Sequence, residues 1–345
     1  MKKILFLLLG LVLFVGCSKD LPSYSEVATE TFTNGFIKEY GTPDKEHTWG
    51  FETTATTRSA DVNSNMWTWR PQDITQAESL KVVNHFKSVQ NPTSININWI
   101  NFFVQHVHSG HGNMDWLYCG AEDHINNFNA TWGSIMKMVN TSTLDFGYHN
   151  SLDSKLHNKY VIQYIDGGYY VGFDFEATGQ NPNQKETADG HYTDWIVKIS
   201  PAYDKIIIAE DLGASESDFD YNDVVFGVDG NVVTLLAAGG TLPLTVDGTE
   251  VHNAFGVATG VMVNTYNYYE YPPVQFKIGY YNNIKDIPLI VNKNGNAYNI
   301  PYFSGAPSAK ICVNYNFVWC KERVPIDTTY PLFKEYVKNQ SIVWY

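Results

Sequence analysis

Acidic side chains crowd one short segment, AEDLGASESDFDYNDVVFGVDG at residues 209–230, around the start of the apolar run at 224–226. Carboxylates this close together repel one another, so the segment needs a compensating group. Carboxylate and amide oxygens are the ligands that Ca²⁺ takes in sets of about six to eight. We therefore predict a Ca²⁺ site whose candidate ligands are Glu210, Asp211, Asp218, Asp220, Asn222 and Asp223.

Other interpretations of this segment compete with a Ca²⁺ site. The D-x-D-x-N spacing is that of an EF-hand, but Asp223 and Asp229 stand where an EF-hand needs Gly and Glu, and strand-like runs flank the segment. The lack of nearby Cys and His disfavours Zn²⁺, and Mg²⁺ usually keeps more of its waters. A solvated acidic turn remains an alternative. A glycan-active hydrolase, which needs two acids about 5 to 9 Å apart, is another. No catalytic constellation is evident, and we expect no enzyme activity.

A fainter copy of the segment precedes it, FDFEATGQNPNQKETADGHYTDWIVKI at residues 173–199. Both stretches consist of a strand, an acidic residue, a polar loop and a D-x-x-x-x-D motif that leads into an apolar strand. Two β-loop-β units of one design could lie side by side and share a site, and coincidence is the alternative for so short and gapped a repeat. The copy adds four weaker candidate ligands: Asp174, Glu176, Asp189 and Asp194.

A second cluster, VQHVHSGHGNMDWLYCGAEDH, contains His106, His108 and His111. Imidazoles that alternate along a strand can bind a transition metal. The spacing to a third ligand follows no recognised metal-site motif, and isolated histidines also serve as hydrogen-bonded structural residues. The sequence leaves both interpretations open.

The N-terminal sequence MKKILFLLLGLVLFVGCSKD is typical of an export signal. Its apolar run is shorter than the roughly 20 residues that a spanning helix needs. Gly16 directly before Cys17 resembles the lipobox of bacterial lipoproteins, so we expect a signal peptide at 1–16 and lipidation of Cys17. This predicts a cell-envelope protein held at the outer membrane by its lipid, exposed at the surface or in the periplasm.

The net charge of −13 argues against a nucleic acid partner. Within the 345 residues, three cysteines follow Cys17: Cys119, Cys312 and Cys320. Cys312 and Cys320 can pair only if CVNYNFVWC folds back as a hairpin, because a straight strand holds them roughly 26 Å apart. The sequence does not decide this pairing.

Hydrophobic periodicity predicts a mainly β protein. Residues 17–65 read as a lipid-anchored tether with a short helix at 25–40, and a second helix is predicted at 76–89. An alternating strand at 94–107 and a hairpin at 159–175 open the β-rich region 66–345, which divides into an N-terminal part, 66–158, and a core sandwich, 159–345. Further strands are predicted at 194–200, 205–210, 223–228, 232–238, 273–281, 287–291 and 309–319, with a terminal helix at 330–339. The expected architecture is an antiparallel β-sandwich or jelly roll with a few peripheral helices.

Several of these segments together resemble the LruC-type domain of outer-membrane lipoproteins from Bacteroides-like bacteria. The resembling residues are EDLGASESDFDYNDVVFGV, LLAAGGTLPLTVDGTEVHNAFGV, MVNT, DIPLIV, APSAKICVNYNFVWCKERVPIDTTYPLFKEYV and the final WY, with EYGTPDKEHTWGF near the N-terminus. Cys320 departs from the Pro expected after Trp319. The resemblance implies an anchored, β-rich exported lipoprotein, and it supplies neither an enzyme activity nor the identity of a ligand. A glycan or protein ligand, used for binding or adhesion, is the partner we expect besides the membrane. A purely structural component of the envelope is a further alternative.

Overall fold

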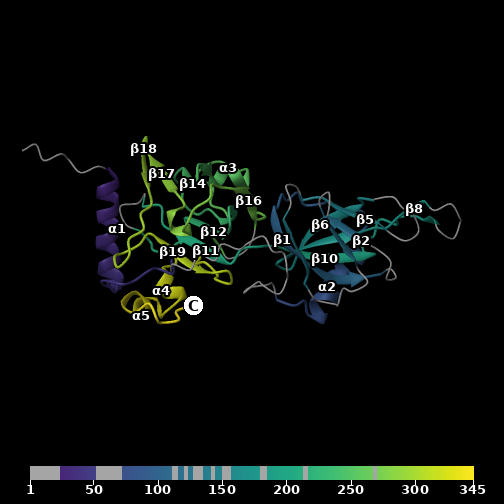
Figure 1. The fold of residues 1–345 in the computed structure, drawn as a ribbon, viewed down its shortest axis with the longest axis horizontal. Coiled ribbons are helices and arrows are strands. Elements are labelled where there is room, and N and C mark those ends of the chain that lie inside the picture. Colours follow the sequence, from purple (N-terminus) through teal and green to yellow (C-terminus); the bar gives the residue numbers. More distant parts are fainter. Residues whose placement is uncertain are drawn as a thin grey trace, which may run out of the picture.

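The computed structural model describes residues 24–51, 72–110, 116–119, 123–126, 135–140, 144–149, 157–178, 185–212, 217–266 and 270–345. These residues form mainly antiparallel sheets with a few peripheral helices, which confirms the predicted fold class. The chain is arranged as two lobes joined end to end (Figure 1). No helix in the described ranges is long and apolar enough to cross a membrane.

The first lobe, residues 72–201, is built on a five-stranded sheet in the order β4-β1-β10-β7-β6. Helix α2 (Gln76–Ser88) packs on one face through Val82 and Phe86. A small sheet, β3-β2-β5, covers the other face, where Leu117 and Phe146 meet Trp195. The strands of this lobe are β1 (Asn101–Ser109), β2 (Trp116–Cys119), β3 (Asp123–Asn126), β4 (Ile135–Asn140), β5 (Phe146–His149), β6 (Tyr160–Ile165), β7 (Gly168–Phe173), β8 (Ala177–Thr178), β9 (Lys185–Glu186) and β10 (Trp195–Pro201).

The second lobe, residues 24–51 and 202–345, packs the five-stranded sheet β16-β13-β12-β11-β19 against the four-stranded sheet β15-β14-β17-β18. One apolar core holds both sheets together with the helices around them. Its strands are β11 (Lys205–Ala209), β12 (Val224–Asp229), β13 (Val232–Ala237), β14 (Leu244–Val246), β15 (Thr249–Glu250), β16 (Val274–Lys277), β17 (Leu289–Lys293), β18 (Asn296–Asn299) and β19 (Lys310–Asn314). Its helices are α1 (Tyr24–Tyr40), α3 (Val251–Phe255), η3 (Ile284–Asp286), α4 (Ile326–Thr329) and α5 (Phe333–Lys338).

Several local predictions are confirmed because their signals are short-range. Helix α2 begins after Thr75, whose hydroxyl accepts a hydrogen bond from the backbone N–H of Glu78 and so satisfies one of the free donors of the first turn. The hairpin β6–β7 turns through Asp166 and Gly167, at φ 50° and 86°. Positive φ at both central residues is the requirement of the tight hairpin turn that a D-G pair predicts.

The structure differs from the predicted domain boundaries. Strands from both sides of the predicted division at 158/159 share the first sheet, because β1 pairs with β10, so the lobes divide at about residue 202 instead. Helix α1 belongs to the second lobe and not to a free tether, since Phe36 and Tyr40 are buried in its core. Residues 94–100 precede β1 without forming a strand. Cys312 and Cys320 are unpaired thiols.

Gln275 joins the two lobes. Its side-chain oxygen accepts the backbone N–H groups of Ile100 and Asn101, and its nitrogen donates to the carbonyl of Asn101 at 2.7 Å and to the hydroxyl of Thr234 at 3.0 Å. The indole of Trp99 adds a 2.8 Å hydrogen bond to the carbonyl of Pro273. The buried side-chain amide of Gln275 on β16 thus supplies the hydrogen-bond partners of the backbone at Ile100 and Asn101, where the first lobe meets the second.

We expect Gln275→Leu to lower the free energy of unfolding by about 2–4 kcal/mol, because the substitution leaves buried backbone groups without partners. Chemical denaturation measures the change. Gln90→Leu is the matched control, since Gln90 is exposed and makes one hydrogen bond; its effect should stay within about 0.5 kcal/mol. Equal effects of the two substitutions would contradict the assigned role of Gln275.

Candidate metal centre

The acidic segment is a loop whose two ends are fixed side by side. It leaves β11 at Ala209 and enters β12 at Val224, and these two residues are register partners in the antiparallel sheet. The backbone N–H of Glu210 donates to the carbonyl of Ala309, next to β19. Glu210 therefore lies at the end of a central strand that is paired on both sides, and 2% of the residue's surface is exposed.

Two aromatic residues hold the loop backbone in a rare conformation. Phe219 and Tyr221 both have φ of 55°, the left-handed region, which costs a residue with a Cβ roughly 1–2 kcal/mol. Their rings offset this cost. The ring of Phe219 lies 5.4 Å from that of Tyr40 in α1, and the hydroxyl of the fully buried Tyr221 donates to the carbonyl of Ser308. These anchors fix the residues between and beside them, Asp218 and Asp220.

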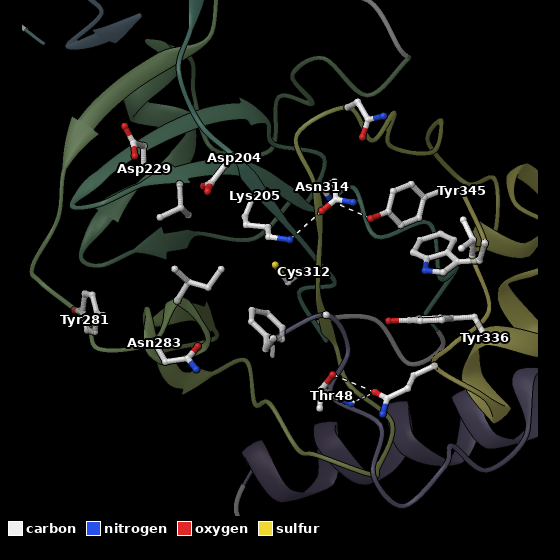
Figure 2. A pocket seen from close by; sticks show the side chains of 18 of the residues that line it. Thr48, Asp204, Lys205, Asp229, Tyr281, Asn283, Cys312, Asn314, Tyr336 and Tyr345 are labelled. Atoms are coloured by element: carbon white, nitrogen blue, oxygen red, sulfur yellow. Dashed lines mark hydrogen bonds between the residues drawn. The ribbon is translucent and has the colours of Figure 1, made fainter. Parts of the chain in front are cut away.

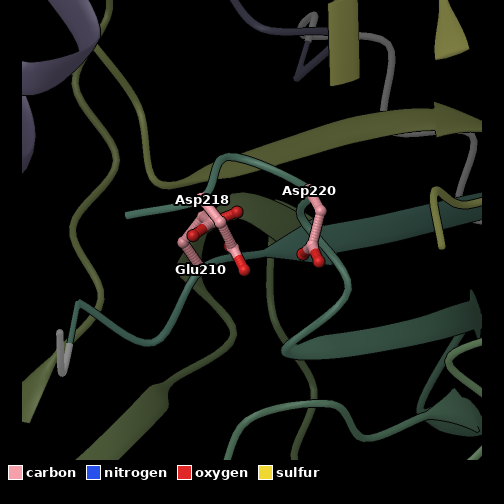
Figure 3. Close-up of side chains that lie close together, drawn as sticks. All are labelled: Glu210, Asp218 and Asp220. Carbon is pink, nitrogen blue, oxygen red and sulfur yellow. The ribbon is translucent and has the colours of Figure 1, made fainter. Parts of the chain in front are cut away.

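Three carboxylates converge as a result. Glu210, Asp218 and Asp220 each offer an oxygen within 4.8 Å of the other two, a geometry that can hold a metal ion. Figure 3 shows Asp218 beside Glu210, with Asp220 across from them. Glu210 and Asp220 are buried, and Asp218 is exposed.

Each buried carboxylate is fixed by donors from the backbone. Glu210 accepts the N–H of Tyr221 at 2.6 Å and the hydroxyl of Ser217. Asp220 accepts the N–H of Asn222 at 3.0 Å and that of Arg323 at 2.7 Å. A carboxylate has about four lone-pair positions, so these bonds orient the groups and leave positions for an ion.

The electrostatics of the cluster favour a cation. Burial, followed by the charges of Asp220 and Asp218, raises the pKa of Glu210 well above its usual range. Burial and the charge of Asp218 raise the pKa of Asp220 to about 7. No ion pair between these three carboxylates and a Lys, Arg or His occurs among the described residues. Within the part of the chain that the structure describes, hydrogen bonds are the only compensation for their charge.

The other three predicted ligands take different roles. Asp223 accepts the N–H of Asp211 at 2.7 Å and so closes the loop, and burial followed by the charges of Asp211 and Glu210 raises its pKa. Asn222 directs its nitrogen, not its oxygen, to Asp220, at 2.8 Å. These contacts place Asn222 and Asp223 as supports of the cluster; Asp211 lies outside the group of three as well.

The weaker candidates form a loop of the same construction. In the first lobe Phe173 pairs with Trp195, as Ala209 pairs with Val224 in the second. Asp194 accepts the N–H of Phe175 at 2.6 Å, the counterpart of the bond from Asp211 to Asp223. The internal repeat is therefore structural. The prediction that the two units share a site is wrong, because they belong to different sheets.

The two loops differ in how they compensate their buried carboxylate. Asp174, at the position equivalent to Glu210, is 1% exposed and holds the ammonium of Lys159 at 2.9 Å. It also accepts the N–H groups of Asp189 and Gly190. At Glu210 the neighbouring charges are the carboxylates of Asp218 and Asp220 instead of an ammonium. The loop of the first lobe has a cation of the chain, Lys159, beside its buried acid, whereas the loop of the second lobe has a group of carboxylates that could hold a metal ion.

The remaining candidates within the described residues do not join a metal centre. Glu176 is exposed and pairs with His157. The imidazole of His106 accepts the indole N–H of Trp195 at 3.2 Å, and burial followed by the charge of His108 lowers its pKa to about 4. The described residues of the histidine segment form no metal-binding group. His111 and Cys17 lie outside the described residues.

Sequence reasoning missed the groups that act through the backbone or from a distance. Ser217 was within the acidic segment, but its hydroxyl was not recognised as the donor to Glu210. Arg323 contributes only its backbone N–H, which no residue-type pattern reveals. Lys159 carried no local signal at all, because its partner lies on another segment.

A comparison of the chain with models of known protein families, with curated proteins and with solved structures finds no match.

The pKa of Asp220 predicts a pH dependence for the metal-free protein. The folded-state pKa, about 7, lies above the usual 3.8, so ionised Asp220 destabilises the fold above pH 7 and this penalty shrinks as protonation proceeds between pH 7 and 4. Relative to Asp220→Asn, the wild type should lose about 1–3 kcal/mol of unfolding free energy between pH 5 and pH 8. Denaturation in EDTA at both pH values measures this; a difference that is constant with pH would contradict it.

Lys159→Met should lower the free energy of unfolding by about 1–3 kcal/mol, because Asp174 would stay buried without its ammonium. Adding Asp174→Asn to the same chain should recover part of the loss, since the amide carries no charge. A double-mutant cycle measured by denaturation tests the coupling. Strict additivity of the two substitutions would show that the ion pair is not the source of the effect.

Proposed function

We propose that Glu210, Asp218 and Asp220 bind Ca²⁺, and that the ion fastens the second lobe of a lipid-anchored cell-envelope protein that serves binding or adhesion. The observation that carries the proposal is the convergence of three carboxylates, two of them buried, at a position where the duplicate loop holds the ammonium of Lys159.

The donor set favours Ca²⁺ among the divalent cations. The three converging ligands are all carboxylate oxygens, which disfavours Zn²⁺. Three carboxylates supply part of the roughly six to eight oxygens of a Ca²⁺ shell. A cavity of about 440 Å³ borders the cluster and has Glu210, Asp218 and Glu322 among its lining residues, so water can complete the shell from that side.

An ion at this position would tie together segments that are distant in the sequence. The loop contacts α1 through the ring of Phe219, and the carbonyl of Phe219 accepts the N–H of Ile326 at the start of α4. Asp220 is bonded to the backbone of Arg323. Binding would therefore order the N-terminal helix, the acidic loop and the C-terminal segment as one unit, which suits a protein that must present a stable surface.

The envelope location rests on the sequence. The export signal, Cys17 and the resemblance to the LruC-type domain support a lipoprotein. Helix α1 begins at Tyr24 and is packed in the core, so only residues 18–23 separate it from Cys17. Six residues reach about 20 Å at most, and the lipid would hold the second lobe close to the bilayer.

A glycan-active hydrolase that uses this loop is the second candidate. The observation that favours it is the pKa of Asp220, about 7, a value suited to a general acid. Against it, Asp220 is 2% exposed and hydrogen-bonded to two backbone N–H groups, which limits access to a glycosidic oxygen. Release of reducing ends from a glycan by the wild type, lost in Asp220→Asn, would favour the hydrolase.

Removal of Ca²⁺ should lower the Tm of the wild type by about 5 °C, because Ca²⁺ at about 100 times its Kd adds about 2.7 kcal/mol to the folded state. Melting curves in EDTA and in Ca²⁺ measure the shift. Asp218→Asn combined with Asp220→Asn should abolish it. The matched control is Asp189→Asn, the equivalent of Asp218 in the loop that has its own ammonium, and this variant should keep the full shift. Identical wild-type curves in EDTA and Ca²⁺ would refute the proposal.

A further inference from the structure

A second cavity, of about 500 Å³, lies in the same lobe and shares no lining residue with the cavity beside the carboxylate cluster. Its floor is a row across three strands, in which Lys205 on β11 is the register partner of Val228 on β12 and of Asn314 on β19. Figure 2 shows Lys205, Asn314 and Cys312 at the base of this cavity. Its volume lies within the range of roughly 300–1,000 Å³ that is usual for small-molecule sites.

Aromatic side chains stand on two sides of the cavity, and each side is anchored. Tyr345, which is 39% exposed, accepts the backbone N–H of Asn314 at 3.0 Å through its hydroxyl oxygen. Tyr281 lies on the side of the cavity away from Tyr345 (Figure 2). The hydroxyl of Tyr281 donates to Asp247 at 2.6 Å. The rings are therefore held in place before any ligand arrives, which reduces the entropy that binding would cost.

The polar lining is rich in carboxamides, with four asparagines and one glutamine. Three of them use their oxygen within the protein. Asn314 accepts from the ammonium of Lys205, Asn283 from the N–H of Lys285, and Gln340 from Thr48. Within the described residues their NH₂ groups donate no hydrogen bond, so the cavity presents oriented donors for the oxygens of a ligand.

The charges at the cavity select against an anionic ligand. Asp204 and Asp229 both line it, no arginine among the described residues does, and Lys205 is already bonded to Asn314. A phosphate, a sulfate or an acidic sugar would meet two carboxylates and no available guanidinium. A purely apolar ligand is also disfavoured, because it would strip water from the amides without replacing their hydrogen bonds.

A peptide that extends the sheet is disfavoured as well. β19 is the edge strand, but the backbone N–H of Cys312 donates to the carbonyl of Trp49 at 2.9 Å. Gly50 fits closely against this strand, since a Cβ at Gly50 would lie 2.0 Å from the carbonyl oxygen of Cys312. The edge beside the cavity is thus covered by residues 49–50, which leaves no open ladder there for an added strand.

We infer that this cavity binds a neutral sugar of a glycan. A pyranose ring has C–H faces that pack on aromatic rings and hydroxyl groups that both donate and accept. The rings of Tyr345 and Tyr281 would pack on the C–H faces of the sugar. The carboxamide NH₂ groups would donate to sugar oxygens, and the carboxylates of Asp204 and Asp229 would accept from sugar hydroxyls. The inference concerns a different cavity from the carboxylate cluster and does not rest on the bound ion.

Isothermal titration calorimetry of the full mature chain tests this inference with cellotetraose, maltotetraose, mannotetraose and xylotetraose, each in Ca²⁺ and in EDTA below the melting temperature. At least one neutral tetrasaccharide should bind. Tyr345→Ala should weaken that binding about tenfold through loss of the ring contact, and Asn316→Ala, an exposed lining residue, should weaken it as well. Tyr266→Ala is the matched control, because Tyr266 is 52% exposed and lies outside the cavity; it should bind like the wild type.

Three results would overturn the inference: no binding of any neutral tetrasaccharide, binding that Tyr345→Ala and Asn316→Ala leave unchanged, or binding only of tetragalacturonate or of peptides from a casein digest. Because the Ca²⁺ proposal is tested by melting curves and Asp218→Asn with Asp220→Asn, either proposal can fail while the other stands. Sugar binding that persists in that double variant would confirm that the two sites are separate.

Discussion

The burial of Glu210 and Asp220 beside Asp218 is the constraint around which the second lobe is arranged. Two carboxylates are held out of water and a third stands within 4.8 Å, a combination that repels unless something opposes it. Backbone donors from Tyr221, Asn222 and Arg323 oppose it in part, and they do so only while the loop, α1 and the C-terminal segment stay in register. The left-handed backbone at Phe219 and Tyr221 is held by the same packing. Loop, helix and C-terminal segment therefore depend on one another.

The duplicate loop of the first lobe shows one way in which a buried acid at this position is compensated. Both loops join neighbouring antiparallel strands, bury one acid at the strand end, and close with an aspartate bonded to a backbone N–H. They differ in the partner of the buried acid: Lys159 in one case, two further carboxylates in the other. The same loop construction thus occurs with an ammonium of the chain beside the buried acid in the first lobe and with two further carboxylates beside it in the second.

Local signals in the sequence were sufficient for many elements and failed where partners come from far away. Alternating apolar residues predict β6 and β7, and the D-G pair predicts their turn, because period-two burial and positive φ each restrict the residue types at those positions. The acidic loop is also a local signal, because its carboxylates follow one another within a short stretch of sequence. The orientation of the Asn222 amide, the role of Lys159, the backbone donor of Arg323 and the lobe boundary near residue 202 depend on strand pairing and packing, which residue types alone do not encode. Residues 94–100 show the limit of alternation. Trp99 is buried in the core of the first lobe and its indole donates to the carbonyl of Pro273, although residues 94–100 form no strand.

The asymmetry between the two loops makes the two lobes depend differently on the solution around them. The first lobe, with Lys159 built in, needs nothing from its surroundings to neutralise Asp174. The second lobe places Glu210 and Asp220 beside Asp218 and pairs them with no ammonium among the described residues, so protons or cations from the solution must balance their charge. The stability of the second lobe would therefore follow the composition of its surroundings, while that of the first lobe would stay nearly constant.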